Sequence, residues 1–130
     1  MARVPGASAV RVLTVDDQAV FRGIARAVID ATPGFEAVGE AAGGEEALAA
    51  VEQLDPALVI CDVRMPGVDG IEVARRLSTA RPATLVVLVS VEEPAMHPSA
   101  AALGEQVPLV RKQDFGPRLL ERLWRARTPM

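Results

Sequence analysis

The sequence predicts an α/β fold, in which helices cover both faces of a parallel β-sheet. Two observations support this prediction. Short β-branched or apolar runs alternate five times with segments of helical periodicity. Polar residues also follow directly after several of these runs, at one predicted edge of the sheet. The 130 residues fit a single domain. We expect it to span residues 10–126, with a flexible N-terminus over 1–9 and a tail over 127–130.

The first strand and helix are predicted from residues 10 to 31. The β-branched run Val10–Val15 is typical of a buried strand. A helix is expected over Ala19–Ala31, and Thr32-Pro33-Gly34 ends it. One face of this helix is apolar and is expected to face the sheet: Val20, Ile24, Ala27, Val28 and Ala31.

The second and third strands are each followed by a clear helical pattern. The second strand is expected at Phe35–Gly39, and a helix over Glu45–Leu54 turns Ala47, Leu48 and Val51 inward before Asp55-Pro56 breaks it. The third strand, Ala57–Cys61, is apolar on both faces, as a central parallel strand should be. The helix after it starts at Asp69 or Gly70 and carries four apolar residues: Ile71, Val73, Ala74 and Leu77.

The last third of the chain is less regular. Thr84–Val89 is the fourth predicted strand, but Pro94 and Pro98 exclude a long uninterrupted helix after it. A short helix is expected at about Ser99–Leu103. The fifth strand is placed at Val107–Val110. Asp114 is expected to cap a final helix with an apolar stripe of Leu119, Leu120, Leu123 and Trp124.

Composition excludes several classes of protein. Half of the residues are hydrophobic and 24% are charged, which argues against disorder. The net charge of −3 lacks the cationic surplus of a direct nucleic-acid binder. The single cysteine, Cys61, excludes an internal disulfide and suits a reducing cytosol. No run approaches the ~20 apolar residues of a membrane helix, and the N-terminus lacks the apolar core of a signal peptide. We therefore expect a cytoplasmic protein without a membrane partner.

Five polar side chains follow the predicted strands. Asp16 and Asp17 come after the first strand, Asp62 after the third, Ser90 after the fourth and Lys112 after the fifth. Ligands of open α/β sheets bind outside the carboxyl ends of the strands. Three carboxylates, a hydroxyl and an ammonium are therefore expected to meet in one crevice.

These groups suit a metal-assisted phosphoryl transfer. Clustered carboxylates repel one another unless a cation joins them, and Mg²⁺ prefers oxygen ligands. A carboxylate can accept a phosphoryl group as a nucleophile, and cations stabilise the charge that develops on it. Each residue alone has a plainer interpretation: an Asp-Asp pair more often caps a helix, and a lone lysine is most often exposed. The prediction depends on all of them sharing one edge.

Four segments carry a family resemblance: VLTVDDQAVFR at Val12–Arg22, LVICDVRMPGVDGIE at Leu58–Glu72, LVVLVS at Leu85–Ser90 and LVRK at Leu109–Lys112. By their order and spacing the chain resembles the receiver domain of two-component response regulators across residues 10–126. The resemblance implies a flavodoxin-like, doubly wound (βα)5 fold with strand order 2-1-3-4-5. The segment PGFEAVGEAAGGEEAL further resembles regulators that usually carry a helix-turn-helix output domain, which implies transcription regulation.

The resemblance also implies a role for each site residue. Asp62 matches the phosphoacceptor, which also contacts the metal. Asp17 and Asp16 match the acidic ligands of Mg²⁺, and the backbone carbonyl of Arg64 matches a further metal ligand. Ser90 matches the switch hydroxyl, and Lys112 the lysine that pairs with the phosphoryl group. Such a domain is not a conventional enzyme, but it catalyses its own phosphorylation and slow dephosphorylation. Its implied partners are a histidine kinase or phosphotransfer protein, and a homodimer is a further option.

Departures from the family pattern leave alternatives open. Leu109 stands where an aromatic residue is common, and Val91 stands where a small residue is usual. These features, with Pro94 and Pro98, keep open a degenerate receiver that binds partners without phosphorylation. A third alternative is a Mg²⁺-dependent hydrolase, such as a phosphatase, that uses the same aspartyl chemistry. The lack of a cap domain or substrate-binding insertion argues against it. The sequence does not decide between a stand-alone receiver and a portion of a longer regulator.

Overall fold

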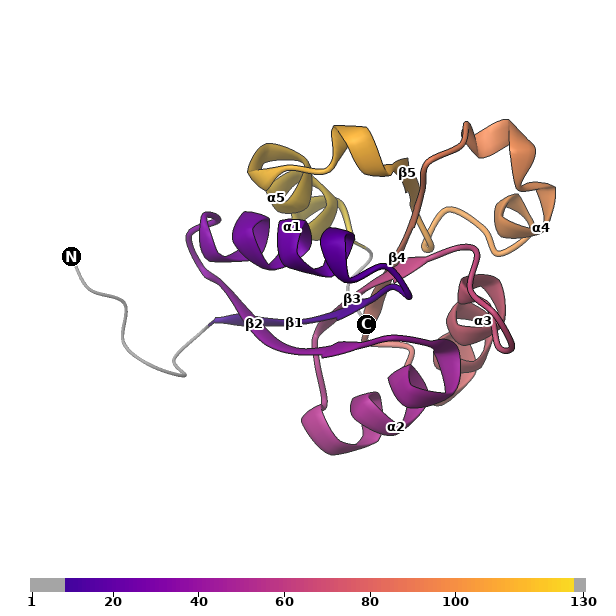
Figure 1. Ribbon diagram of the computed structural model, residues 1–130, viewed down its shortest axis with the longest axis horizontal. Coiled ribbons are helices and arrows are strands. Elements are labelled where there is room, and N and C mark those ends of the chain that lie inside the picture. Colours follow the sequence, from indigo (N-terminus) through magenta and orange to yellow (C-terminus); the bar gives the residue numbers. More distant parts are fainter. Residues whose placement is uncertain (1–8, 128–130) are drawn as a thin grey trace.

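The computed structural model describes residues 9–127. Within them, parallel strands form one sheet in the order β2-β1-β3-β4-β5 (Figure 1). The strands are β1 Val10–Val15, β2 Phe35–Ala41, β3 Leu58–Asp62, β4 Leu85–Ser90 and β5 Leu109–Arg111. This confirms the predicted class, the flavodoxin-like arrangement and the strand order. The expected loose ends, 1–9 and 127–130, lie outside the described residues except for Ala9 and Arg127.

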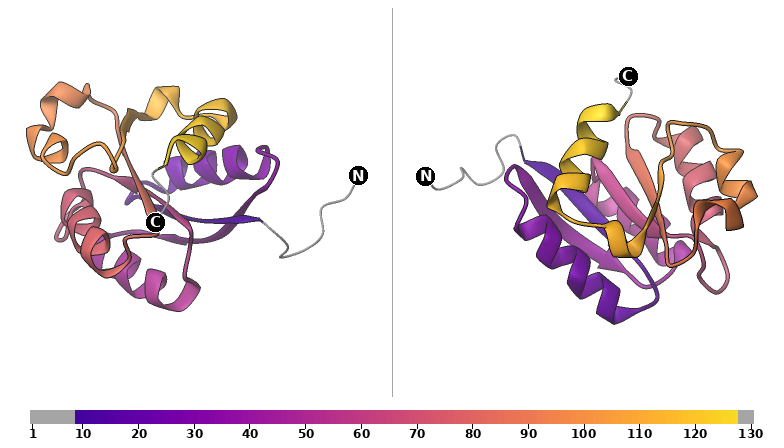
Figure 2. Two further views of the ribbon diagram at one scale, coloured as in Figure 1. Left: turned by 180° about the vertical axis from the view of Figure 1, so that it is seen from behind. Right: turned by 90° about the horizontal axis from the view of Figure 1, so that it is seen from above.

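Helices cover both faces of the sheet, as Figures 1 and 2 show. The helices are α1 Ala19–Asp30, α2 Gly44–Leu54, α3 Gly70–Ala80, α4 Pro98–Ala101 and α5 Pro117–Ala126, with short 3₁₀ turns η1 Pro94–Met96 and η2 Lys112–Asp114. Helices α2, α3 and α4 pack into one apolar core, and α1 and α5 into the other. The sheet lies between the two cores, and β3 and β4 are buried along their whole length. Such central strands can be apolar on both faces.

Helix α1 turns a largely different face to the sheet from the one expected, and of the expected stripe only Val28 packs against the core. Its buried residues are Phe21, Ala25 and Ile29, whereas Val20 and Ile24 are 76% and 51% exposed. Both stripes are apolar, so periodicity alone did not separate them. Packing selects the stripe with the aromatic ring: Phe21 contacts Phe115 at 6.1 Å between ring centroids.

Two predicted boundaries near the C-terminus were also wrong. Strand β5 begins at Leu109, not Val107, and Leu109 pairs with Leu88. Pro108 has no amide hydrogen to donate to the ladder, although its carbonyl accepts from the Leu88 N–H at 2.8 Å. Asp114 lies in η2 and does not cap α5. That helix begins at Pro117, and a proline suits the first helical position.

The remaining expectations for this region are borne out in part: the short helix lies slightly earlier than Ser99–Leu103, and Leu119 lines a pocket and is not among the core residues. Between β4 and β5, helix α4 has four residues and no long helix forms, as Pro94 and Pro98 predict. In α5, Leu120 is fully buried, and Leu123 and Trp124 pack against the same core. No helix among residues 9–127 is long and apolar enough to cross a membrane.

Candidate functional site

The carboxyl ends of β1 and β3 bring three carboxylates together. Asp16 and Asp17 follow β1, and Asp62 is the last residue of β3. One ligand oxygen from each of these residues lies within 4.8 Å of the other two. This spacing joins residues far apart in sequence because β1 and β3 are adjacent and parallel, with Val15 opposite Cys61. The predicted acidic cluster therefore forms.

Lys112 inserts its ammonium between two of these carboxylates. Its Nζ lies 2.6 Å from Asp16 Oδ2 and 3.4 Å from Asp62 Oδ2. The same Nζ lies 4.6 Å from the centroid of the Phe21 ring, so α1 supplies one wall around it. The lysine side chain is 13% exposed. Lys112 therefore belongs to the site, as predicted, and not to the solvated surface.

Asp16 combines a structural bond with an oxygen left for the site. Its Oδ1 accepts a hydrogen bond from the Gln18 N–H at 2.8 Å, in the turn that leads into α1. Its Oδ2 is buried and has no hydrogen-bond partner among the described residues, and it forms the ion pair with Lys112 described above. A buried carboxylate oxygen with an ion pair but no hydrogen bond has lone pairs left for a bound metal cation.

Burial and two neighbouring charges act on the Asp62 carboxyl in opposite directions. It is 8% exposed, and burial is the main reason that the pKa of its carboxyl is raised. The Lys112 ammonium acts in the opposite direction, and the Asp16 carboxylate adds to the rise in pKa. The Arg64 N–H donates a long hydrogen bond of 3.4 Å to Asp62 Oδ1. A further positive charge beside Asp62 would favour its ionised, nucleophilic form.

A pocket of about 420 Å³ opens over this cluster. Asp17, Asp62, Ser90 and Lys112 all line it, so the structure brings predicted residues from four different strand ends to one cavity. Its remaining walls include exposed apolar side chains: Val20 and Ile24 from α1 and Val91 after β4. The pocket is thus polar at the carboxylates and apolar at its rim.

The start of α3 lies directly against the end of β3. The Gly70 N–H donates to the Val63 carbonyl at 3.0 Å. A Cβ added at Gly70 would lie 2.1 Å from the Asp62 carbonyl oxygen. Only a glycine allows this approach, so Gly70 helps to fix the backbone that presents Asp62.

Sequence reasoning missed the residues that hold Ser90. The Ser90 hydroxyl is buried and lies 2.8 Å from Nε2 of His97, and it accepts from the Glu92 N–H at 3.0 Å. Glu92 in turn forms an ion pair with Arg64, at 2.6 Å from Arg64 Nε. The only available signal was that His97 is the one histidine of the chain.

Comparison with known proteins finds related sequences. The family model described as "Response regulator receiver domain" matches residues 12–123. A protein-glutamate methylesterase/protein-glutamine glutaminase of Agrobacterium fabrum is 39% identical over 93 residues, which cover 72% of this chain and 26% of that protein. The response regulator GacA of Pseudomonas protegens is 36% identical over 125 residues, which cover 85% of this chain and 58% of that protein.

Solved structures give the same picture. The response regulator domain of Thermotoga maritima CheB superposes with a TM-score of 0.75 at 31% identity, covering 91% of this chain and 96% of that chain. A LuxR-family two-component response regulator of an Aurantimonas species gives 0.78 at 26% identity, with coverages of 95% and 90%. The chain spans only 26% and 58% of the length of the two curated relatives above.

Proposed function

The chain belongs to the family of response regulator receiver domains, and on that premise we propose that it accepts a phosphoryl group on Asp62 in a Mg²⁺-dependent reaction. The observation that carries this proposal is the joint position of Asp62, the ammonium of Lys112 and the oxygens of Asp16 and Asp17. This arrangement supplies a nucleophile and its counter-charges in one pocket.

In the proposed reaction, a carboxylate oxygen of Asp62 attacks the phosphorus atom of the donor. A new O–P bond forms as the bond from phosphorus to the donor breaks, and the donor leaves with that electron pair. The ammonium of Lys112 lies where it can pair with the transferred oxygens. Asp16, Asp17, Asp62 and the backbone carbonyl of Arg64 would hold Mg²⁺, which supplies positive charge to the phosphoryl oxygens.

The rim of the pocket suits a protein donor. Val20, Ile24 and Val91 are 76%, 51% and 69% exposed, and all three line the cavity that contains Asp62. Exposed apolar residues gathered beside a reactive group are typical of an interaction site. The donor in this proposal is a histidine kinase or a phosphotransfer protein whose own apolar surface covers this rim.

Phosphorylation in this proposal switches the domain to control an output. A cytoplasmic location and an output in transcription are further parts of the proposal, and the likeness to a LuxR-family response regulator supports the second. The alternative is a degenerate receiver that binds partners without phosphorylation. Leu109 favours that alternative, since it is half-buried in the core where the family commonly has an aromatic side chain.

The deciding experiment is an intact-mass measurement after incubation with acetyl phosphate and Mg²⁺. We expect one phosphoryl adduct on the wild type, no adduct without Mg²⁺, and none on Asp62→Asn. Asp55→Asn is the matched control, because Asp55 is an exposed aspartate outside the pocket, and it should be modified like the wild type. An adduct that forms on Asp62→Asn at the wild-type rate would contradict the assignment.

A further inference from the structure

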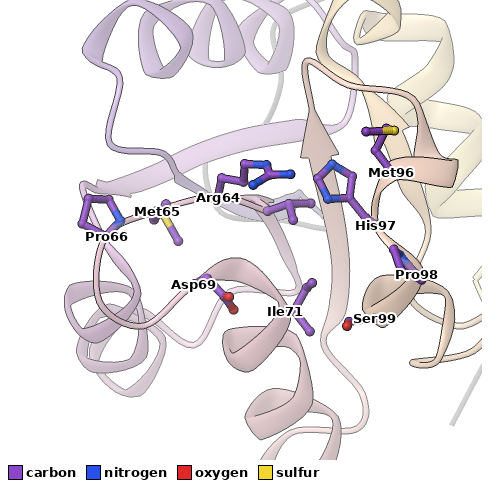
Figure 3. Close-up of a pocket in the computed structure, with 10 residues that line it drawn as sticks. Arg64, Met65, Pro66, Asp69, Ile71, Met96, His97, Pro98 and Ser99 are labelled. Atoms are coloured by element: carbon purple, nitrogen blue, oxygen red, sulfur yellow. The ribbon is translucent and has the colours of Figure 1, made fainter.

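His97 is a buried imidazole beside the site. It is 5% exposed, and its Nε2 lies 2.8 Å from the hydroxyl oxygen of Ser90. Figure 3 shows the ring at the wall of a second pocket of about 470 Å³, facing the side chain of Arg64. Buried polar groups are nearly always hydrogen-bonded, so this contact fixes both side chains.

The charges around His97 determine which atom donates. Glu92 Oε1 lies 3.6 Å from the same Nε2, and Arg64 Nε holds that carboxylate at 2.6 Å. A carboxylate accepts hydrogen bonds and does not donate them when ionised. Its position beside Nε2 favours a hydrogen on that nitrogen. The Nε2–H group then donates to Ser90.

The hydroxyl of Ser90 then has its acceptor capacity filled. A hydroxyl has two lone pairs and one hydrogen. Ser90 Oγ accepts from the Glu92 N–H at 3.0 Å and, with this tautomer, from His97 Nε2. The one group left to Ser90 is its own O–H. A hydroxyl held in this way can only donate, which suits an anionic phosphoryl oxygen.

We infer that His97 is a positioning residue for the phosphorylation site, which donates from Nε2 to Ser90 and leaves the serine hydrogen free for a phosphoryl oxygen on Asp62. This inference rests on the proposed function. His97 also lies between η1 and α4. The contact with His97 therefore connects Ser90 to the segment between β4 and β5 without a ring at position 109.

The first test does not require phosphorylation. Because the chain has one histidine, the nitrogen NMR signals of its ring are unambiguous. We expect a hydrogen on Nε2 in the wild type, and a shift of that signal in Ser90→Ala. An Nε2 without hydrogen, or a signal indifferent to Ser90→Ala, would overturn the inference even if Asp62 is phosphorylated.

The second test is a double-mutant cycle on the rate of phosphorylation by acetyl phosphate with Mg²⁺. His97→Leu removes the donor and should slow the rate about threefold to tenfold, the equivalent of one hydrogen bond. His97→Gln keeps an N–H group and should recover most of the rate. In the Ser90→Ala background, neither change should have a further effect. Met96→Leu, at an exposed neighbour, is the control and should match the wild type.

The outcomes separate this inference from the proposed function. If His97→Leu slows phosphorylation equally in the wild-type and Ser90→Ala backgrounds, His97 is a purely structural residue. If Ser90→Ala is phosphorylated at the wild-type rate, the Ser90 hydroxyl has no role for His97 to support. Either result would overturn the inference. If His97→Leu does not fold, the comparison of His97→Gln with the wild type and the ring NMR still decide. A wild type that takes up no phosphoryl group would refute the proposed function, while the NMR result on His97 would stand.

Discussion

At the residue scale, the choice of lysine at position 112 has a physical reason. It is the only lysine in the sequence, and every other cationic side chain among the 14 is arginine. Its Nζ approaches Asp16 and Asp62 at 2.6 and 3.4 Å beneath the Phe21 ring. A compact ammonium fits between two carboxylates in this space, whereas a planar guanidinium binds a single carboxylate best through two parallel bonds.

Lys112→Ala should retain Mg²⁺ binding but slow phosphorylation by acetyl phosphate about 10- to 100-fold. The change leaves the carboxylate oxygens in place but removes one counter-charge from the transferred group. Lys112→Arg should restore little of the rate, for the geometric reason above. The rate is measured by intact mass and Mg²⁺ affinity by calorimetry. Arg118→Ala, at an exposed cation on α5, is the control. An unchanged rate in Lys112→Ala would refute this role.

At the scale of elements, the junction of β3 and α3 is closely packed against the site. Helix α3 begins at Gly70 against the Asp62 carbonyl, and Asp69 caps it by accepting from the Glu72 N–H at 2.9 Å. The segment between β4 and β5 is different, because it contains only short helical turns. The site is therefore bounded by a closely packed junction at β3 and α3 and by an irregular segment between β4 and β5.

Gly70→Ala should lower the free energy of unfolding by about 1–3 kcal/mol, because the new Cβ meets backbone that cannot move aside cheaply. Gly23→Ala is the matched control. It lies inside α1 with nothing within 4 Å of an added Cβ, and helix propensity predicts a gain of about 0.5–1 kcal/mol. Urea unfolding measures both. A Gly70→Ala variant as stable as the wild type would mean that the junction is not tightly packed.

The segment Val91–Gln106 should exchange its amide hydrogens faster than helix α2. A helix of four residues is far shorter than isolated helices need for stability, and Pro94 and Pro98 remove two backbone donors. Hydrogen exchange with and without beryllofluoride, a phosphoryl mimic, tests this. We expect protection in the segment to change with the mimic in the wild type but not in Ser90→Ala. Protection equal to that of α2, and unaffected by the mimic, would contradict it.

At the scale of the whole molecule, the buried carboxylate of Asp62 lowers the stability of the fold at neutral pH. The sheet separates two apolar cores, and the carboxylates lie at one edge of that buried layer. Burial raises the pKa of Asp62 above its ordinary value despite the nearby Lys112. The native state therefore holds this proton to higher pH than the unfolded chain. Stability attributable to Asp62 falls as the pH rises from about 4 through its folded pKa.

Asp62→Asn should therefore raise the midpoint of thermal unfolding at pH 7 without Mg²⁺, since the amide carries no buried charge. The difference from the wild type should shrink as the pH is lowered toward about 4, where Asp62 is increasingly protonated. Mg²⁺ at pH 7 should narrow it by binding the native wild type more tightly. Calorimetry over this pH range measures the effect. A wild type at least as stable as the variant at pH 7 would show that the attraction of Lys112 outweighs burial.

The order of the elements, and the grouping of the candidate site residues at one edge of the sheet, could be predicted from the sequence. Strands such as β1 and β4 consist of short local runs rich in branched apolar residues, so composition and periodicity suffice to predict them. Asp16, Asp62 and Lys112 could be grouped without coordinates, because parallel strands deliver their carboxyl ends to one edge. The prediction of the site followed from the topology.

Three features could be known only from the tertiary structure: the buried face of α1, the start of α5 and the contact between Ser90 and His97. Helix α1 offers two apolar stripes, and only packing against α5 and the sheet selects Phe21 over Val20. Asp114 did not indicate the start of α5, because the helix begins three residues later, at Pro117, and a proline suits the first helical position. The bond between Ser90 and His97 joins residues seven positions apart across an irregular turn. No periodic pattern records such a contact, because it depends on how the chain folds back between β4 and β5.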